Sequence, residues 1–424
     1  FDAFMQCFGE AFASIASALE ADDASVLASP QFQHALQALF LDLTGVLTAA
    51  KKDNHYRIFF DWIYHDFAPL ILALVERYYD NPSVVNPMLV FWADLVNNPS
   101  RRIKFPPASP NGILLFKATS KILVAYAAQL LQNGFPAAVE EFAAVRLAAA
   151  SQAQGPSSDR TAADGDANAE GPSHALAAQL EATFSGIELC LAMLRLSFSG
   201  DYCCFGVFDL YDDKALVDAI DCALALVVAI PFELLLLYPT LCSGYYAFLE
   251  VLAKTHTREL LRQSEETLGR ILLSLKSGLQ SFQRRIFTQS CGALEFLTTF
   301  QYEMASAGKH PELAEMLQKH LDSQAAAIYP EILEVLASIY LLIDNSRLPQ
   351  WAVAKPFLNF IVLYSNEFER IKADIVAREP PHRRERIAEA YETLLDDVDS
   401  TLDVKNRDRF GRRLAAFCRM IKEV

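Results

Sequence analysis

Apolar side chains recur at helical spacing along almost the entire chain, and no long stretch shows the alternation of a half-buried β-strand. Apolar positions three and four residues apart run from Leu36 to Leu47, from Leu268 to Phe282 and from Ile387 to Leu402. A last amphipathic stretch runs from Phe410 to Ile421. Because this period places the apolar side chains on one face of a helix, the sequence predicts an all-α fold.

Prolines and small polar residues divide this pattern into separate helices. Ser29 before Pro30, and Ser109 before Pro110, are typical of an N-cap followed by proline at the first helical position, where its missing N–H costs no hydrogen bond. The expected helices cover residues 2–20, 30–51, 56–79, 83–97, 111–133, 135–151, 174–198, 212–229, 232–254, 257–277, 279–306, 322–344, 349–377, 381–401 and 405–422.

So many helices of this length cannot share one small core. Antiparallel pairs that repeat about every 40–50 residues are typical of HEAT or armadillo arrays. We therefore expect an α-solenoid of stacked antiparallel helix pairs, with a first block at 1–150 and a second block at 174–424 that ends in a capping helix. Similarity between the repeats is weak, so a compact multi-helix bundle is the alternative.

The segment 151–173 interrupts the helical pattern. It has two Gly-Pro steps and many small polar residues, and it lacks any bulky apolar residue. Such a segment buries too little apolar surface to offset the loss of chain entropy, so we expect a flexible insertion. Most insertions of this kind are simply tolerated at the surface, and the alternative is a regulatory or partner-binding loop.

Composition excludes several classes of protein. The net charge is −15, whereas a nucleic-acid binder needs an excess of cations to neutralise phosphates. Apolar residues make up 52% of the chain, which is enough for a large core. The eight cysteines form no C-x-x-C pair, and the adjacent Cys203 and Cys204 suit neither zinc nor an ordinary disulfide. Buried thiols in a reducing compartment, cytosol or nucleus, are the expectation.

The apolar stretches 222–232 and 234–249 are the segments weighed as membrane spans. The first is followed by Glu233, and the second is interrupted by Pro239 and Gly244. A span needs about 20 continuous apolar residues, so we expect helices buried within a soluble protein and no membrane insertion. The first residue is Phe1 and not methionine, so we expect the chain to be a piece of a longer protein.

Motifs that carry out chemistry are missing from the sequence. Neither G-x-G-x-x-G nor the P-loop pattern occurs, H-E-x-x-H is absent, and the eight histidines are scattered. The pair Glu265-Glu266 is typical of a solvated helix face. We therefore expect no enzyme activity, no cofactor and no metal site.

Three clusters of charged residues are candidates for binding a partner. The basic turn comprises Arg101, Arg102 and Lys104. The acidic turn comprises Asp209, Asp212 and Asp213. The C-terminal basic cluster comprises Lys405, Arg407 and Arg409. Each has an alternative without function: a solvated loop for the basic turn, a helix N-terminus for the acidic turn, and ion pairs within and between helices for the C-terminal basic cluster.

Five blocks of sequence, in order, carry a family resemblance. They are FDWIYHDFAPLIL at 60–72, SPNGILLFKATSKIL at 109–123, FGVFDLYDDKAL at 205–216, LLLYPTLCSGYYAFLEVLA at 235–253 and KNRDRFGRRLAAF at 405–417. Together they resemble the C-terminal part of the exportin-7 family of nuclear transport receptors, in the importin-β (karyopherin-β) superfamily. The segments 151–173 and 303–325 depart from that pattern. The first fifty residues share only its helical character.

The resemblance implies a superhelix of HEAT repeats whose inner face holds protein cargo and Ran-GTP, and whose outer grooves take Phe-Gly nucleoporins. It implies cooperative binding of cargo and Ran-GTP, shuttling between nucleus and cytoplasm, and a monomer. The acidic turn would meet a basic surface, as acidic loops meet Ran in this superfamily. The N-terminal repeats that carry the main Ran-GTP contact are not part of the resemblance, so a Ran-independent α-solenoid scaffold is the alternative.

Overall fold

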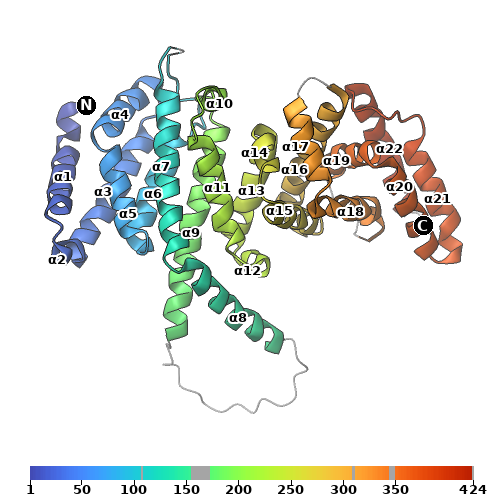
Figure 1. Ribbon diagram of the computed structural model, residues 1–424, viewed down its shortest axis with the longest axis horizontal. Helices are drawn as coiled ribbons and strands as arrows, with labels where there is room; N and C mark the ends of the chain where they lie inside the picture. Colours follow the sequence, from blue (N-terminus) through green and yellow to red (C-terminus); the bar gives the residue numbers. More distant parts are fainter. Residues whose placement is uncertain (107, 154–171, 308–310, 343–348, 423–424) are drawn as a thin grey trace. The chain divides into compact units, whose positions relative to one another are not determined.

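The structure is a computed structural model that describes residues 1–106, 108–153, 172–307, 311–342 and 349–422. Across these ranges the regular elements are helices, and no strand occurs (Figure 1). The predicted all-α class is confirmed.

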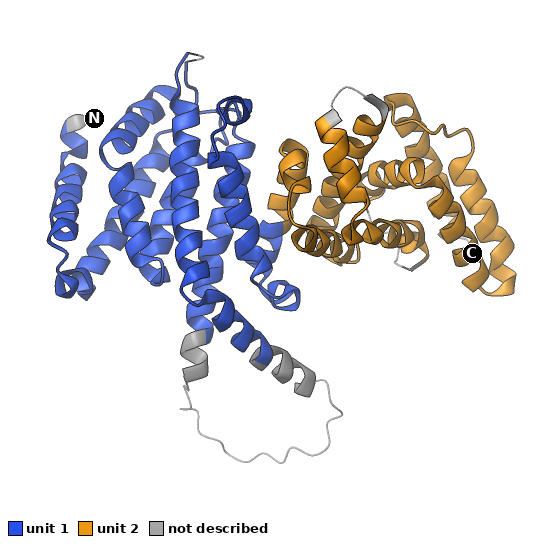
Figure 2. Ribbon diagram, in the orientation of Figure 1, with its two compact units in different colours: residues 1–245 blue, residues 246–424 orange. Residues whose placement is uncertain are grey.

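The chain forms two compact units, residues 1–245 and 246–424 (Figure 2). The boundary falls inside helix α13, Pro239–Thr255. The predicted grouping into blocks at 1–150 and 174–424 rests on the position of the insertion, and it stays a prediction.

Short turns connect most helices of the first unit. Their bounds are α1 Asp2–Ala21, α2 Ala24–Leu27, α3 Pro30–Ala49, α4 Asp53–Asp66, α5 Ala68–Tyr78, α6 Pro82–Val96, α7 Asn111–Gln132, α8 Phe135–Ala153, α9 Pro172–Phe198, α10 Gly206–Leu210, α11 Ala215–Val228 and α12 Phe232–Leu237. Helix α6 packs between α3 and α9 in one layer, and α7 packs between α5 and α11 in a second layer. These stacked layers confirm the predicted α-solenoid arrangement.

The second unit repeats the two-layer plan. Its helices are α14 Thr257–Leu261, α15 Glu265–Gly278, α16 Arg284–Ala307, α17 Pro311–Leu321, the 3₁₀ helix η1 Gln324–Ala327, α18 Ile328–Leu342, α19 Gln350–Leu363, α20 Ser365–Arg378, α21 Pro381–Leu395 and α22 Val404–Lys422. Helix α19 packs between α16 and α22, and α18 packs between α15 and α20. Helix α21 packs against α22 and α20.

Local chemistry explains several helix boundaries. Ser29 Oγ accepts a hydrogen bond from the Phe32 N–H at 3.3 Å, so Ser29 is the predicted N-cap of α3. The predicted helix 56–79 is two helices, α4 and α5, which meet at Phe67 with a bend of 64°. Pro69 is the physical reason, because it has no N–H to donate to the carbonyl four residues earlier.

Buried polar side chains join neighbouring helices. The Trp92 indole donates to Thr119 Oγ1 at 2.9 Å between α6 and α7, and the Tyr56 hydroxyl donates to the Leu95 carbonyl at 2.7 Å between α4 and α6. In the second unit the Tyr391 hydroxyl donates to the Ala337 carbonyl at 2.7 Å. Because each of these three donors has a partner, Trp92, Tyr56 and Tyr391 fill the core without a desolvation penalty.

Among the residues that the structure describes, two helices are long and apolar enough to cross a membrane by length and composition alone, namely α7 and residues 177–198 of α9. The bent pair of α4 and α5 would pass the same test as one broken span. The stretches weighed from sequence, 222–232 and 234–249, are not among them. In this fold α7 packs against α5 and α11, and α9 packs against α6. The expectation of no membrane insertion stays a prediction.

Most of the predicted insertion 151–173 lies outside the described residues, which resume at Pro172 after Ala153. The two ends of the predicted segment are helical, because α8 ends at Ala153 and α9 begins at Pro172. The expected flexibility of the segment therefore stays a prediction.

We predict that Phe410→Ala loosens the last helices first. Phe410 is fully buried, its ring centroid lies 5.8 Å from that of Phe357 on α19, and truncating a buried Phe costs about 3–5 kcal/mol. Because a stacked array transmits such a loss mainly to its neighbours, hydrogen exchange should lose protection in 381–422 and keep it in 56–133.

The control is Val404→Ala, at a position of the same helix that is 74% exposed. This variant should exchange like wild type. Equal loss of protection in both ranges for Phe410→Ala would indicate one cooperative core and contradict the solenoid.

Candidate functional site

Two of the three charged clusters lie at the same end of the first unit, where the loop after α6 meets the loop after α9 (Figure 1). The Asn98 amide donates to the Gly200 carbonyl at 2.7 Å and so joins the two loops. Gly112 lies against Tyr202 so closely that a Cβ there would be 1.9 Å from the Tyr202 carbonyl oxygen. We call residues 97–106 and 199–214 the loop site.

An aromatic cluster forms the base of the loop site. The Phe116 ring on α7 lies 4.9 Å from Phe205 and 5.3 Å from Phe208, and Phe198 lies 5.3 Å from Phe205. Tilted and edge-to-face pairs at these distances add to the stabilisation from burial. Helix α10 is therefore held firmly on the unit although it is only one turn long.

The outer side of α10 presents two adjacent apolar residues. Leu210 and Tyr211 are each 76% exposed, next to the acidic turn. Tyrosine beside aliphatic surface is typical of the residues that dominate protein interfaces. Neither residue was a candidate from sequence, because an apolar pair in a helical pattern indicates core; only exposure in the fold distinguishes them.

Asp213 and Asp212 of the acidic turn pair with lysines. Asp213 accepts from Lys117 Nζ at 2.7 Å and from the Ala215 N–H at 3.0 Å, where α11 begins. The hydrogen bond from Lys117 lowers the pKa of Asp213. Asp212 has a side chain 86% exposed, and it pairs with Lys214 at 2.5 Å. Asp209 is exposed. Asp213 lies at the N-terminus of α11, as the alternative from sequence predicted for the acidic turn.

Within the basic turn, Arg102 is a structural residue. It is 9% exposed, and its guanidinium donates to the carbonyls of Leu47 at 2.7 Å and Asp94 at 2.8 Å. The guanidinium carbon lies 5.5 Å from the centre of the Tyr56 ring, and burial lowers the pKa of Arg102. Since its donors are engaged inside the unit, we do not include Arg102 in a partner surface.

The other members of the basic turn face solvent. Arg101 and Lys104 are both exposed, and Arg101 has the left-handed backbone angle φ of 53°. The structure therefore places these two cations on the same end of the unit as Asp209 and Asp212, although about 100 residues separate the turns in sequence.

The C-terminal basic cluster lies in the second unit, at the start of α22. Arg407 contacts Glu295 Oε1 on α16 at 3.5 Å and donates to the Leu402 carbonyl at 2.9 Å. Arg409 pairs with Asp399 at 3.1 Å. Lys405 is exposed. The alternative from sequence, ion pairs within and between helices, therefore describes Arg407. Arg409 instead pairs with the loop that precedes α22, and Lys405 stays a candidate for partner binding.

A groove of about 470 Å³ lies between α5 and α7. Apolar side chains including Leu72, Leu114 and Ile122 line it, together with Tyr64 and Lys121. Lys117, which pairs with Asp213, also lines the groove and so connects it to the loop site. Sequence reasoning did not single out this groove, because its two walls are far apart along the chain.

Among the described residues, no group of three His, Cys, Asp or Glu side chains could hold a metal ion. Burial raises the pKa of Cys203 to about 12 and raises those of Cys190 and Cys291, so these thiols stay protonated. Cys204 is exposed.

Comparison with known proteins gives one consistent set of relatives, although no protein-family model matches the chain. Exportin-7-B of Xenopus laevis is 28% identical over 429 residues, an alignment that covers 100% of this chain and 35% of the relative. Ran-binding protein 17 of Homo sapiens is 28% identical over 395 residues, covering 92% and 33%. Exportin-7 of Dictyostelium discoideum is 24% identical over 384 residues, covering 91% and 34%.

The chain is similar over its whole length to exportin-7, and it matches the C-terminal part of that protein. It spans about a third of the length of the curated relatives it matches. The resemblance found in five sequence blocks is therefore confirmed, and the relatives bear the names of exportins and Ran-binding proteins, not of enzymes.

We predict that Arg102→Ala destabilises the first unit. The change leaves buried carbonyls without donors, which costs about 1–3 kcal/mol of unfolding free energy. The melting temperature should fall by about 2–4 °C for each kcal/mol lost. Lys104→Ala removes an exposed cation from the same turn and should leave the melting temperature unchanged. Equal melting temperatures for the two variants would exclude the structural role of Arg102.

Proposed function

We propose that this chain is part of a nuclear export receptor that binds protein cargo and Ran-GTP cooperatively. The observation that carries the proposal is the alignment of the whole chain with exportin-7, together with the match to Ran-binding protein 17. The two-layer stacks of helices agree with it, because such stacks provide extended surfaces for other proteins. The net charge of −15 would favour encounter with basic partners.

The proposed mechanism is thermodynamic linkage and involves no covalent chemistry on this chain. Ran-GTP and cargo would each bind the receptor more tightly when the other is bound, and hydrolysis of GTP on Ran would release both. The receptor would shuttle between nucleus and cytoplasm as a monomer. Its candidate contacts with Ran or cargo are the exposed charges Arg101, Lys104, Asp209, Asp212 and Lys405.

Passage through the nuclear pore requires a surface for Phe-Gly nucleoporins. The groove between α5 and α7 suits this role, because it is apolar and lies between neighbouring helices of one layer. Its depth would accept an aromatic ring from an extended partner.

A Ran-independent scaffold is the second candidate function. It is favoured by one observation: Asp212, Asp213, Arg407 and Arg409 pair with groups of this chain, which reduces the charge available to Ran. A receptor would accumulate at the nuclear envelope in a Ran-dependent way, whereas a scaffold would be insensitive to Ran depletion.

We predict that Ran-GTP increases cargo capture by the full-length protein. Immobilised protein would be incubated with nuclear extract and either Ran-GTP or Ran-GDP, and bound proteins would be quantified by mass spectrometry. A coupling of about 1–3 kcal/mol corresponds to roughly 5–150-fold tighter cargo binding. Equal recovery of every bound protein in the two states would refute the exportin proposal and leave the scaffold.

We predict that Asp209→Lys combined with Asp212→Lys slows association with Ran-GTP and flattens its dependence on salt. Charges at the rim of an interface act mainly on the association rate. Asp213 is left intact because it accepts from the Ala215 N–H at the start of α11 and from Lys117 on α7. The matched control, Asp42→Lys with Glu76→Lys, changes the net charge equally at exposed positions on α3 and α5. Identical association rates for the two double variants at low salt would remove the acidic turn from the Ran contact.

A further inference from the structure

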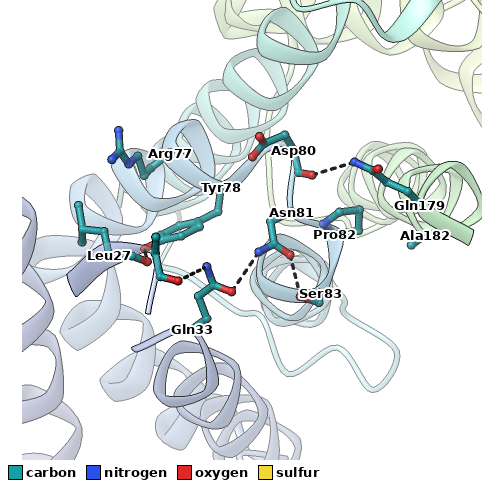
Figure 3. A pocket seen from close by; sticks show the side chains of 11 residues that line it. Leu27, Gln33, Arg77, Tyr78, Asp80, Asn81, Pro82, Ser83, Gln179 and Ala182 are labelled. Atoms are coloured by element: carbon teal, nitrogen blue, oxygen red, sulfur yellow. Dashed lines mark hydrogen bonds between the residues drawn. The ribbon is translucent and has the colours of Figure 1, made fainter. Parts of the chain in front are cut away.

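A second cleft, of about 580 Å³, opens in the first unit beside the turn between α5 and α6 (Figure 3). Its walls come from the end of α2, from α3, from this turn and from α9. The turn beside the cleft lies before α6 and the loop site lies after α6, so the length of this helix, about 22 Å, separates the cleft from the loop site. The cleft is therefore distinct from the charged clusters discussed above.

Side-chain carboxamides from three elements converge on this cleft. Asn81, in the turn, donates to Gln33 Oε1 on α3 at 3.2 Å and accepts from Ser83 Oγ at 2.7 Å. From α9, Gln179 donates to the Asp80 carbonyl at 3.4 Å (Figure 3). The Asn81 contacts join the turn to α3, and the longer Gln179 contact joins the turn to α9.

The amides keep hydrogen-bonding capacity for a ligand. A carboxamide has two N–H donors and an oxygen that accepts twice. Among the described residues, the side-chain nitrogen of Gln179 makes one contact, at 3.4 Å to the Asp80 carbonyl, and that of Gln33 makes one, at 3.5 Å to the Ala28 carbonyl. Both distances are long for an N–H···O bond, so a ligand could take these donors with little loss.

The floor of the cleft is formed by buried, mostly apolar side chains. Leu27, Tyr78 and Pro82 are buried there, and the Tyr78 hydroxyl is occupied by the Leu27 carbonyl at 2.8 Å. The charged lining groups are one cation, Arg77, and one anion, Asp80. A lining with balanced charge does not select an anion or a cation, whereas amides above an apolar floor suit a neutral ligand with alternating donors and acceptors.

We propose that this amide-lined cleft binds an extended polypeptide segment of a partner protein through its backbone. A carboxamide can donate to a peptide C=O and accept from a peptide N–H, so recognition would depend little on the partner's side chains. The cleft volume lies within the range of about 300–1,000 Å³ typical of ligand sites. The inference does not depend on Ran, because either a transport receptor or a scaffold could hold such a segment.

The test begins with a displayed library of random twelve-residue peptides selected on the full-length protein without Ran. Selected peptides would be synthesised, and their affinities measured by fluorescence anisotropy. Gln33→Ala with Gln179→Ala removes two amides from the cleft and should weaken binding about tenfold or more, since each lost hydrogen bond costs about three- to tenfold. Ala182→Phe places a large side chain in the cleft and keeps the amides, and this variant should abolish peptide binding.

The control removes the same number of amides outside the cleft. Gln31→Ala with Gln132→Ala changes exposed positions on α3 and α7 and should bind like wild type. Methylating the backbone nitrogen of central peptide residues should reduce affinity about three- to tenfold at one or more positions, whereas single side-chain changes to alanine should matter less.

Several results would overturn the proposal. The first is that every selected peptide still binds the Ala182→Phe variant. The second is that the two double variants bind the peptides with equal affinity. The third is that backbone methylation has no effect and the peptide side chains alone set the affinity. If the wild-type protein bound a twelve-nucleotide single-stranded DNA and the Ala182→Phe variant did not, the cleft would be assigned to nucleic acid instead. Peptide binding by the cleft is measured without Ran, so a lack of Ran-dependent cargo capture would not change it. The two proposals therefore fail separately.

Discussion

Helices in this protein carry more apolar surface than a single neighbour can cover, and this constraint underlies the whole architecture. Helix α6 is buried on most sides, with Val84, Met88, Phe91 and Trp92 all inaccessible to solvent. Its surface is covered because α3 and α9 flank it in one layer and α5 and α7 lie in the other. The stack is therefore a requirement of burial, and the turns and loops at its ends are free to carry recognition.

Polar contacts decide where the ends of the stack are rigid. Arg102 joins the chain after α6 to the end of α3, and Asp213 joins the start of α11 to α7. Both side chains belong to clusters that suggested partner binding from sequence. Their engagement holds the loop site in shape, and the exposed neighbours Leu210, Tyr211 and Asp212 are thereby presented on a fixed base.

The two candidate surfaces of the first unit differ in chemistry. The loop site combines exposed charges with an apolar pair, which suits a folded partner with a specific surface. The cleft at Gln33, Asn81 and Gln179 has amides and balanced charge, which suits a backbone. A protein that handles varied partners would benefit from both kinds of recognition.

Local sequence determined the helical class and the cap at Ser29, because helix period and capping depend on residues within one or two turns. The number and spacing of the helices predicted a stack, and the packing of the helices decided it against a compact bundle. The collinear blocks also determined the relationship to exportin-7. Tertiary structure alone decided that Arg102 is buried while Arg101 is exposed, and that residues 33, 81 and 179 share one cleft. These outcomes depend on which helices pack together. A run of charged residues or a single amide has the same local sequence whether or not a residue from a distant part of the chain packs against it.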